Sequence, residues 1–166
     1  MNRINLGCGD RYQHGWHNVD AAGSPHRKDE EVDLRGALPW HDVTHVYAGH
    51  ILEHLFVGEA ICLLQALRDC MAPDGEIMVV GPDVLVAQDM ATAGTLGVTM
   101  DSLTNGGHRW PGDEHRWHCT ASDIETLLCV TGWSDVKRVG INDVPQLWPV
   151  ADRGPQWQCA VSARHD

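Results

Sequence analysis

The sequence has few basic residues and little aromatic character beyond tryptophan. Lysine and arginine total 12 against 23 aspartates and glutamates, which gives a formal net charge of -11, and there is a single phenylalanine. A chain this acidic repels a polyanion over most of its surface. The sparse basic group of Arg109, Arg116, Lys137 and Arg138 is too thin to reverse that repulsion. The composition therefore disfavours nucleic acid as a partner.

Long apolar runs and paired cysteines are also missing. No apolar stretch reaches the ~18 residues of a membrane span, and the first residues lack the apolar core of a signal peptide. The six cysteines are scattered and form no CxxC pair. We therefore expect a reduced, soluble, cytoplasmic protein with no membrane partner and no structural disulfide.

What is present suits one domain over residues 1–166, because 166 residues at 43% apolar content can bury a single core. Apolar residues recur at helical spacing over 51–71, with a break expected near Gly58, and weaker helical patterns cover 84–90 and 120–130. Ser122, three residues before Glu125, resembles a helix cap. Strands are expected at 3–6, 17–20, 31–34, 43–48, 76–80, 136–141 and 157–163. This alternation predicts an α/β fold with a mostly parallel sheet.

Two glycines follow the first expected strand, in the stretch INLGCGD. In an open α/β sheet, ligands bind beyond the carboxyl ends of the strands. Gly7 and Gly9 therefore stand where a ligand could approach bare backbone. Asp20 ends the second expected strand, where a carboxylate can accept the hydroxyls of a ribose.

A longer set of motifs carries a resemblance. INLGCGD, GWHNVD, VDLRGALPW, VYAGHILEHL and RDCMAPDGEIMVVGPD, in this order, resemble the class I S-adenosylmethionine-dependent methyltransferases. The chain looks most like the small predicted methyltransferases found beside sugar and cell-surface biosynthesis genes. The resemblance covers roughly residues 3–140, through GGHRWPGDEHRW and SDIETLLCVTGW. It implies a Rossmann-like three-layer sandwich with a mostly parallel seven-stranded sheet and an antiparallel carboxyl-terminal strand.

The same resemblance implies S-adenosyl-L-methionine as the cofactor. Asp20 would hold the ribose, Asp33 and Leu34 the adenine edge, and Gly49 and His50 the methionine end. The implied cofactor-binding residues are Asn5, Leu6, Gly7, Cys8, Gly9, Asp20, Asp33, Leu34, Gly49 and His50.

The acceptor is expected to be an oxygen of a small molecule or a glycan. Many methyltransferases that act on nucleobase or glutamine amides carry Asn-Pro-Pro-aromatic after the fourth strand, where this chain has AGHILEH. The candidate general bases are His50, His54, His115 and Asp83. His50 could instead contact the cofactor, Asp83 could cap a helix, and Glu53 could either orient a histidine or cap the helix start.

The chain also departs from the family pattern. Only Arg11 to His17 separate the glycine turn from the second strand, so the first helix must be lost or reduced to one turn. With no lid helices before the first strand, we expect a neighbouring subunit of a homo-oligomer, or a large substrate, to cover the cofactor site. These departures keep open an alternative function, a cofactor-binding module without transferase activity that serves as a partner or regulatory subunit.

A histidine-rich segment lies late in the chain. His108, Asp113, Glu114, His115 and His118 are metal-ligand types, but their spacing fits no zinc motif, so no metal site is predicted. A metal-dependent hydrolase is the third alternative. Trp110 and Trp117 in this segment could stack on a sugar ring or simply pack.

Overall fold

The structure is a computed structural model that describes residues 2–108, 112–150 and 156–166. Arg109 and Trp110, named in the sequence analysis, lie outside the described residues. The strands are β1 (Arg3–Leu6), β2 (His17–Asp20), β3 (Glu30–Glu31), β4 (Val43–Gly49), β5 (Met71–Pro82), β6 (Ser134–Val139) and β7 (Gln158–Arg164). The helices are α1 (Val57–Cys70), α2 (Val84–Thr92), α3 (Met100–Thr104) and α4 (Ala121–Val130), with short 3-10 helices η1 (Leu52–His54) and η2 (Ile141–Asp143).

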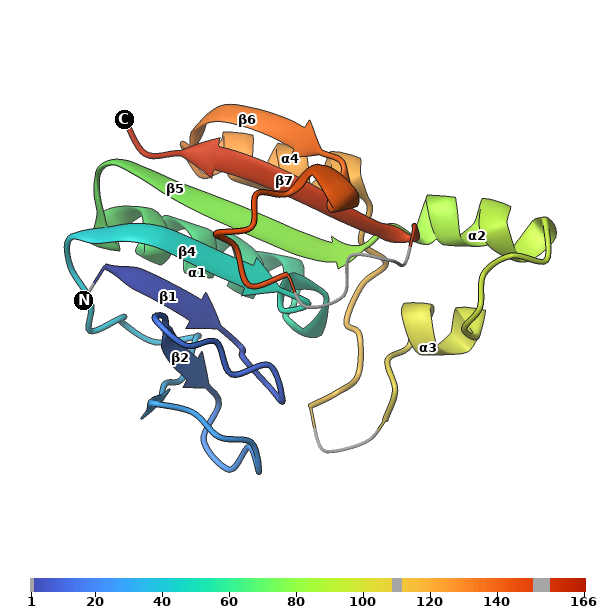
Figure 1. Cartoon of the computed structure of the whole chain (residues 1–166), viewed down its shortest axis with the longest axis horizontal. Coiled ribbons are helices and arrows are strands. Elements are labelled where there is room, and N and C mark those ends of the chain that lie inside the picture. Colours follow the sequence, from blue (N-terminus) through green and yellow to red (C-terminus); the bar gives the residue numbers. More distant parts are fainter. Residues whose placement is uncertain (1, 109–111, 151–155) are drawn as a thin grey trace.

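The seven strands form one sheet in the order β3-β2-β1-β4-β5-β7-β6 (Figure 1). The pairings among β1 to β5 are parallel, and β7 runs antiparallel to both of its neighbours, β5 and β6. This confirms the predicted α/β, Rossmann-like architecture with an antiparallel carboxyl-terminal strand. None of the helices in the described ranges has both the length and the apolar character needed to cross a membrane.

The sheet is covered differently on its two faces. Alternate strand residues such as Leu6, Ala48 and Val79 pack on one face against helices α1 and α4 (Figure 1). On the other face, Tyr47 and Met78 pack against a second cluster that η2 and irregular chain supply. That cluster includes Trp16, Ile141, Val144, Trp148 and Val150. The third layer of the sandwich is therefore built from η2 and irregular chain, with two tryptophans and several aliphatic side chains against the sheet.

Some predicted boundaries were wrong. The predicted helix 51–71 is divided into η1 and α1, and the division falls before Phe56 rather than at Gly58, because the Glu59 carboxylate accepts the Phe56 N–H at 2.8 Å. The predicted strand 31–34 overlaps the two-residue strand β3 only at Glu31. Helix α3 lies in a Gly/Thr-rich region for which no helix was predicted.

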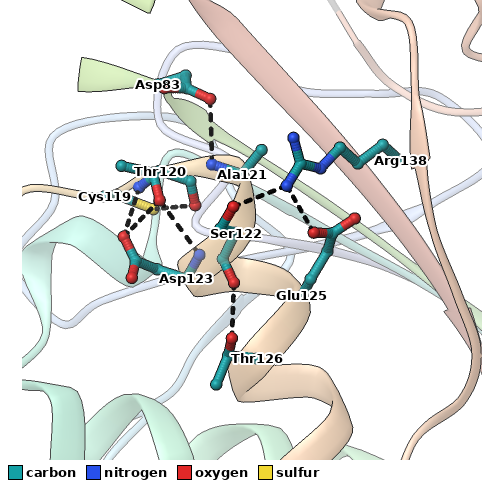
Figure 2. A network of polar contacts seen from close by, with 9 residues as sticks. All are labelled: Asp83, Cys119, Thr120, Ala121, Ser122, Asp123, Glu125, Thr126 and Arg138. Atoms are coloured by element: carbon teal, nitrogen blue, oxygen red, sulfur yellow. Dashed lines mark hydrogen bonds and ion pairs between the residues drawn. The ribbon is translucent and has the colours of Figure 1, made fainter. Parts of the chain in front are cut away.

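The cap of α4 also differs from the prediction. Thr120 is the N-cap and exchanges hydrogen bonds with Asp123, a capping box two residues earlier than predicted. The side chains of Ser122 and Glu125 instead accept hydrogen bonds from the Arg138 guanidinium, each at 2.7 Å (Figure 2). The pairs Thr120–Asp123 and Ser122–Glu125 have the same spacing in the sequence. Only the first pair caps α4, because the side chains of the second pair bind Arg138 of β6.

The connection between β1 and β2 contains only turns, so the predicted loss of the first helix is confirmed. Two buried amides take over its structural role. The Asn5 amide donates to the Asn18 side-chain oxygen at 2.9 Å and to the Arg11 carbonyl at 3.0 Å. The same Asn18 oxygen accepts the Gln13 N–H at 2.7 Å. These bonds satisfy backbone groups that a helix would satisfy internally.

Candidate functional site

A cavity of about 500 Å³ lies at the carboxyl edge of the parallel strands. It opens where the chain order of the sheet reverses, between β1 and β4, which is the usual ligand position in such sheets. Its size falls within the range typical of small-molecule sites. Its wall includes Gly7, Gly9, Gly49, His50, Trp157 and Gln158.

A second hollow, of about 590 Å³, lies at the opposite edge, against Arg3 and His17 at the amino ends of β1 and β2. Although it is larger, its wall includes neither the glycines of the first turn nor the candidate bases His50, His54 and His115. The amino edge of a parallel sheet is not where α/β folds bind ligands. The cavity at the carboxyl edge is therefore the candidate site.

The two glycines of the first turn play different parts. Both have positive φ angles, 61° at Gly7 and 49° at Gly9. A Cβ on Gly7 would lie 1.8 Å from Cδ1 of Ile51, whereas a Cβ on Gly9 would meet nothing within 4 Å. A side chain at Gly7 would therefore have to displace the Ile51 side chain. Gly9 presents open backbone to the cavity.

Asp20 lies beside this turn, at the end of β2. One oxygen of its carboxylate accepts the Gly9 N–H at 3.2 Å and the Ser24 hydroxyl at 2.7 Å, and the other accepts the Ala21 N–H at 2.8 Å. A carboxylate offers about four acceptor positions, so it retains capacity for a further donor. Asp20 therefore fixes the glycine turn, although it is not itself part of the cavity wall.

His50 is held from both sides. Its Nδ1 lies 3.0 Å from Oε1 of Glu53, and its Nε2 lies 2.7 Å from Oε1 of Gln158. Burial favours the neutral ring, but the hydrogen bonds to Glu53 and Gln158 outweigh burial, and the pKa of His50 lies above its ordinary value. The raised pKa favours the protonated ring, in which both nitrogens donate and neither has a lone pair with which to accept a proton.

Glu53 is the most buried charged residue of the site, with 1% of its surface exposed. Burial raises the pKa of its carboxyl, but the hydrogen bond and charge of His50 outweigh burial, and the pKa lies below its ordinary value. Of the two roles considered, the contact with His50 supports the orienting one. Its second oxygen, Oε2, is buried and has no hydrogen-bond partner within the described residues.

His54 and His115 face one another across the cavity wall. Their rings are edge to face, with centroids 4.8 Å apart. Nδ1 of His54 lies 3.3 Å from the Glu114 carbonyl, and Nδ1 of His115 lies 2.9 Å from the Leu103 carbonyl. Burial lowers the pKa of His115, which favours the neutral ring.

Asp83 does not line the cavity. One of its oxygens accepts the backbone N–H groups of Leu85 and Val86 at the start of α2. The other accepts the Ala121 N–H at 3.1 Å and so joins α2 to α4 (Figure 2). The structure therefore gives Asp83 the capping role, one of the two roles that the sequence left open.

Some of the remaining predicted residues line the cavity, and the others lie in the core or at the surface. Asn5 and Cys8 line the cavity, and burial raises the pKa of the Cys8 thiol to about 11, so the thiol stays protonated. The side chain of Leu6 is in the core. Asp33 is 74% exposed and contacts Arg35, and Leu34 packs against the core; neither lines the cavity. Trp117 packs, and its indole N–H donates to the Leu52 carbonyl at 2.8 Å.

Several wall residues were not predicted, notably Tyr47, Asp113, Trp157 and Gln158. Gln158 begins β7, and because β7 is antiparallel to β5, its first residue lies at the carboxyl edge of the sheet. The signals in the sequence were the expected strand 157–163 and the antiparallel carboxyl-terminal strand that the resemblance implies, but neither indicated that Gln158 would reach the cavity.

No protein-family model matches this sequence, and no curated protein sequence does either. Among solved structures, the chain is similar to the S-adenosylmethionine-dependent methyltransferase SibL, with 15% identity over 99% of this chain and 50% of SibL, and a TM-score of 0.61. A methyltransferase from Archaeoglobus fulgidus shares 16% identity over 99% of this chain and 86% of its own, with a TM-score of 0.61.

Human N-acetylserotonin methyltransferase in complex with SAM shares 15% identity over 98% of this chain and 46% of its own, with a TM-score of 0.58. The chain thus spans about half the length of SibL and of the human enzyme. These similarities show that the chain has the class I methyltransferase fold.

Proposed function

We propose that the protein is an S-adenosylmethionine-dependent methyltransferase that uses the cavity at the carboxyl edge of β1 and β4. The observation that carries this proposal is the position of the open Gly9 backbone and Asp20 at the strand-order reversal of this fold. When bound, the cofactor supplies an activated methyl group. The residues that would hold it are the Gly7–Gly9 backbone, Asp20 and the Gly49–His50 turn.

The residues present fit such a ligand. A nucleoside could approach the Gly9 backbone without meeting a side chain, and Asp20 retains acceptor capacity beside it. His50 has a raised pKa and a hydrogen bond at each ring nitrogen, which suits a contact with the carboxylate of the methionine moiety better than it suits proton abstraction. Asp33 and Leu34 remain proposed contacts of the adenine edge.

For the acceptor we propose an oxygen of a small or glycan-like molecule. The side chains of His54 and His115 both line the cavity. We expect the acceptor hydroxyl to bind on the side of the cavity where these two rings lie. The cavity is bounded there by Leu103 of α3 and by Trp157, which supply apolar contact area. A second copy of this chain covering the cavity remains part of the proposal.

Calorimetric titration with the demethylated cofactor tests the proposal. We expect one site per chain, and we expect Asp20→Ala to weaken binding by about 10-fold or more, since the substitution removes the carboxylate beside the turn. Asp69→Ala, which alters an exposed carboxylate on α1, is the matched control and should bind as the wild type does. Failure of the wild-type protein to bind at high micromolar concentration would refute the proposal.

A specific observation also favours the second candidate, a cofactor-binding module without transferase activity. Both ring nitrogens of His50, the first predicted base, are already occupied. Under this alternative the demethylated cofactor binds, but no hydroxylated acceptor from a broad panel is methylated. Methylation of any acceptor in that panel would exclude it.

A further inference from the structure

Three metal-ligand side chains meet on one wall of the cavity. Glu53 and His54 come from η1, and His115 comes from the segment between α3 and α4. A carboxylate oxygen of Glu53 and a ring nitrogen of each histidine lie within 4.8 Å of one another. Glu53 is buried, so this group is unlike the exposed acidic clusters common on protein surfaces.

Hydrogen bonds to backbone carbonyls determine the tautomer of both histidines. A carbonyl can only accept, so the Glu114 and Leu103 carbonyls require a hydrogen on Nδ1 of His54 and of His115. That tautomer leaves the lone pair on Nε2. Histidines that bind metals usually have this arrangement, with the other ring nitrogen donating to a carbonyl or carboxylate. Neither Nε2 has a hydrogen bond to any described residue.

Glu53 adds a second, independent observation. Its Oε1 contacts His50, but Oε2 is buried without a hydrogen-bond partner in the described ranges. An unsatisfied buried oxygen costs about 1–3 kcal/mol, and more when the group is charged. A cation beside the carboxylate would remove that cost.

We propose that Glu53, His54 and His115 bind a divalent transition-metal ion of the zinc class. Two imidazoles and one carboxylate are a ligand set that such ions accept, and three protein ligands leave coordination positions open. Ligand atoms on one tetrahedral ion lie about 3.3 Å apart, so the widest pair would close by up to about 1.5 Å through side-chain rotation. The open positions face the cavity and would take oxygens of a hydroxylated acceptor; this last step rests on the proposed function.

The proposal differs from the sequence prediction of no metal site. That prediction considered the spacing within residues 108–118, and only His115 of that segment belongs to the group. The other two ligands lie more than 60 residues earlier in the chain, so no local motif could reveal them.

Titration of tag-free, chelator-treated protein with Co²⁺ and with Zn²⁺ tests the site. We expect saturation at one equivalent, with a visible Co²⁺ spectrum that lacks thiolate charge-transfer bands, because no cysteine belongs to the group. His54→Gln and His115→Gln should each weaken affinity by about 100-fold or more, since even the loss of a supporting contact costs 10–100-fold. His118→Gln, an exposed histidine of the same segment, is the control and should bind as the wild type does.

Glu53→Gln should also weaken binding; because Glu53 is buried, circular dichroism must first show that this variant folds. If the Glu53→Gln variant does not fold, the His54→Gln and His115→Gln variants still test whether the metal site exists. Absence of stoichiometric binding, or equal binding by the His54, His115 and His118 variants, would overturn the proposal. Titration with the demethylated cofactor is run in parallel. Cofactor binding without metal binding refutes only the metal site, and the converse result refutes only the proposed function.

Discussion

Gly7 and Gly9, separated by one residue, differ in what surrounds them. At Gly7 an added methyl group would overlap the Ile51 side chain, whereas at Gly9 it would point into open space. Both positions have a positive φ, which L-residues adopt at a cost. The sequence INLGCGD shows two equivalent glycines, and only the structure separates a packing glycine from one that leaves room for a ligand.

Alanine substitutions should separate these roles. We expect Gly7→Ala to lower the free energy of unfolding by about 3 kcal/mol, because overpacking adds to backbone strain. Gly9→Ala should cost only about 1–2 kcal/mol, because it carries the strain alone. Urea denaturation measures both. Equal losses in the two variants would show that Ile51 moves aside freely and that packing does not require Gly7.

Four of the predicted site residues line the cavity because they lie at the ends of β1 and β4, whereas Asp20 at the end of β2 does not line it. Gly7, Gly9, Gly49 and His50 follow β1 and β4, and the alternation of elements was enough to bring them to one edge. Gln158 could not be predicted in this way. Its contact with His50 spans 108 residues and depends on the direction of β7, which hydrophobic periodicity does not encode.

At the scale of elements, the short connection between β1 and β2 depends on polar side chains rather than on a helix. Asp29 accepts the Asn18 N–H at 2.9 Å and the Tyr12 hydroxyl at 2.8 Å, and so ties the connection to β2. The hydrogen bonds from Asn18 lower the pKa of Asp29 from its ordinary value of 3.8 to about 2.

This pKa predicts an acid-dependent loss of stability. A carboxyl whose pKa is lower in the folded than in the unfolded chain stabilises the fold fully above about pH 4, and this contribution disappears as the pH falls through about 2. Urea denaturation across this range should show the wild type more stable than Asp29→Asn at pH 5, with the difference shrinking toward pH 2. A difference that stays constant with pH would contradict this account.

The elements that sequence analysis missed, such as α3, or placed wrongly, such as β3, are those with weak local signals. Helix α3 has five residues in a Gly/Thr-rich region, and Thr99 caps it by accepting the Ser102 N–H. β3 has two residues, and its existence depends on pairing with β2 rather than on its own pattern. The longer helices α1, α2 and α4 were predicted because their apolar spacing is sustained over several turns.

At the scale of the whole molecule, the two faces of the sheet are covered by different kinds of structure. One side has regular helices, and the other depends on irregular chain carrying Trp16 and Trp148, whose rings lie 5.7 Å apart. Trp148 also contacts His45 of β4, with ring centroids 5.4 Å apart. Large buried aromatic rings therefore cover this face of the sheet, as the helices cover the opposite face.

We therefore expect Trp148→Ala to lower the free energy of unfolding by about 3–5 kcal/mol, as for other buried aromatic truncations. Trp148 is 4% exposed and its neighbour Leu147 is 38% exposed, so Leu147→Ala is the matched control. The control should change stability by no more than about 0.5 kcal/mol. A small loss in the Trp148 variant would mean that the irregular layer is not a substantial part of the core.

The place of β7 in the sheet has a consequence for biosynthesis. β5 and β6 leave the ribosome first, yet β7 inserts between them and brings Gln158 to His50. Until that insertion, a nascent chain has a gap one strand wide and two unsatisfied strand edges. The contact between His50 and Gln158 can therefore form only after translation has passed β7 and this strand has paired with β5.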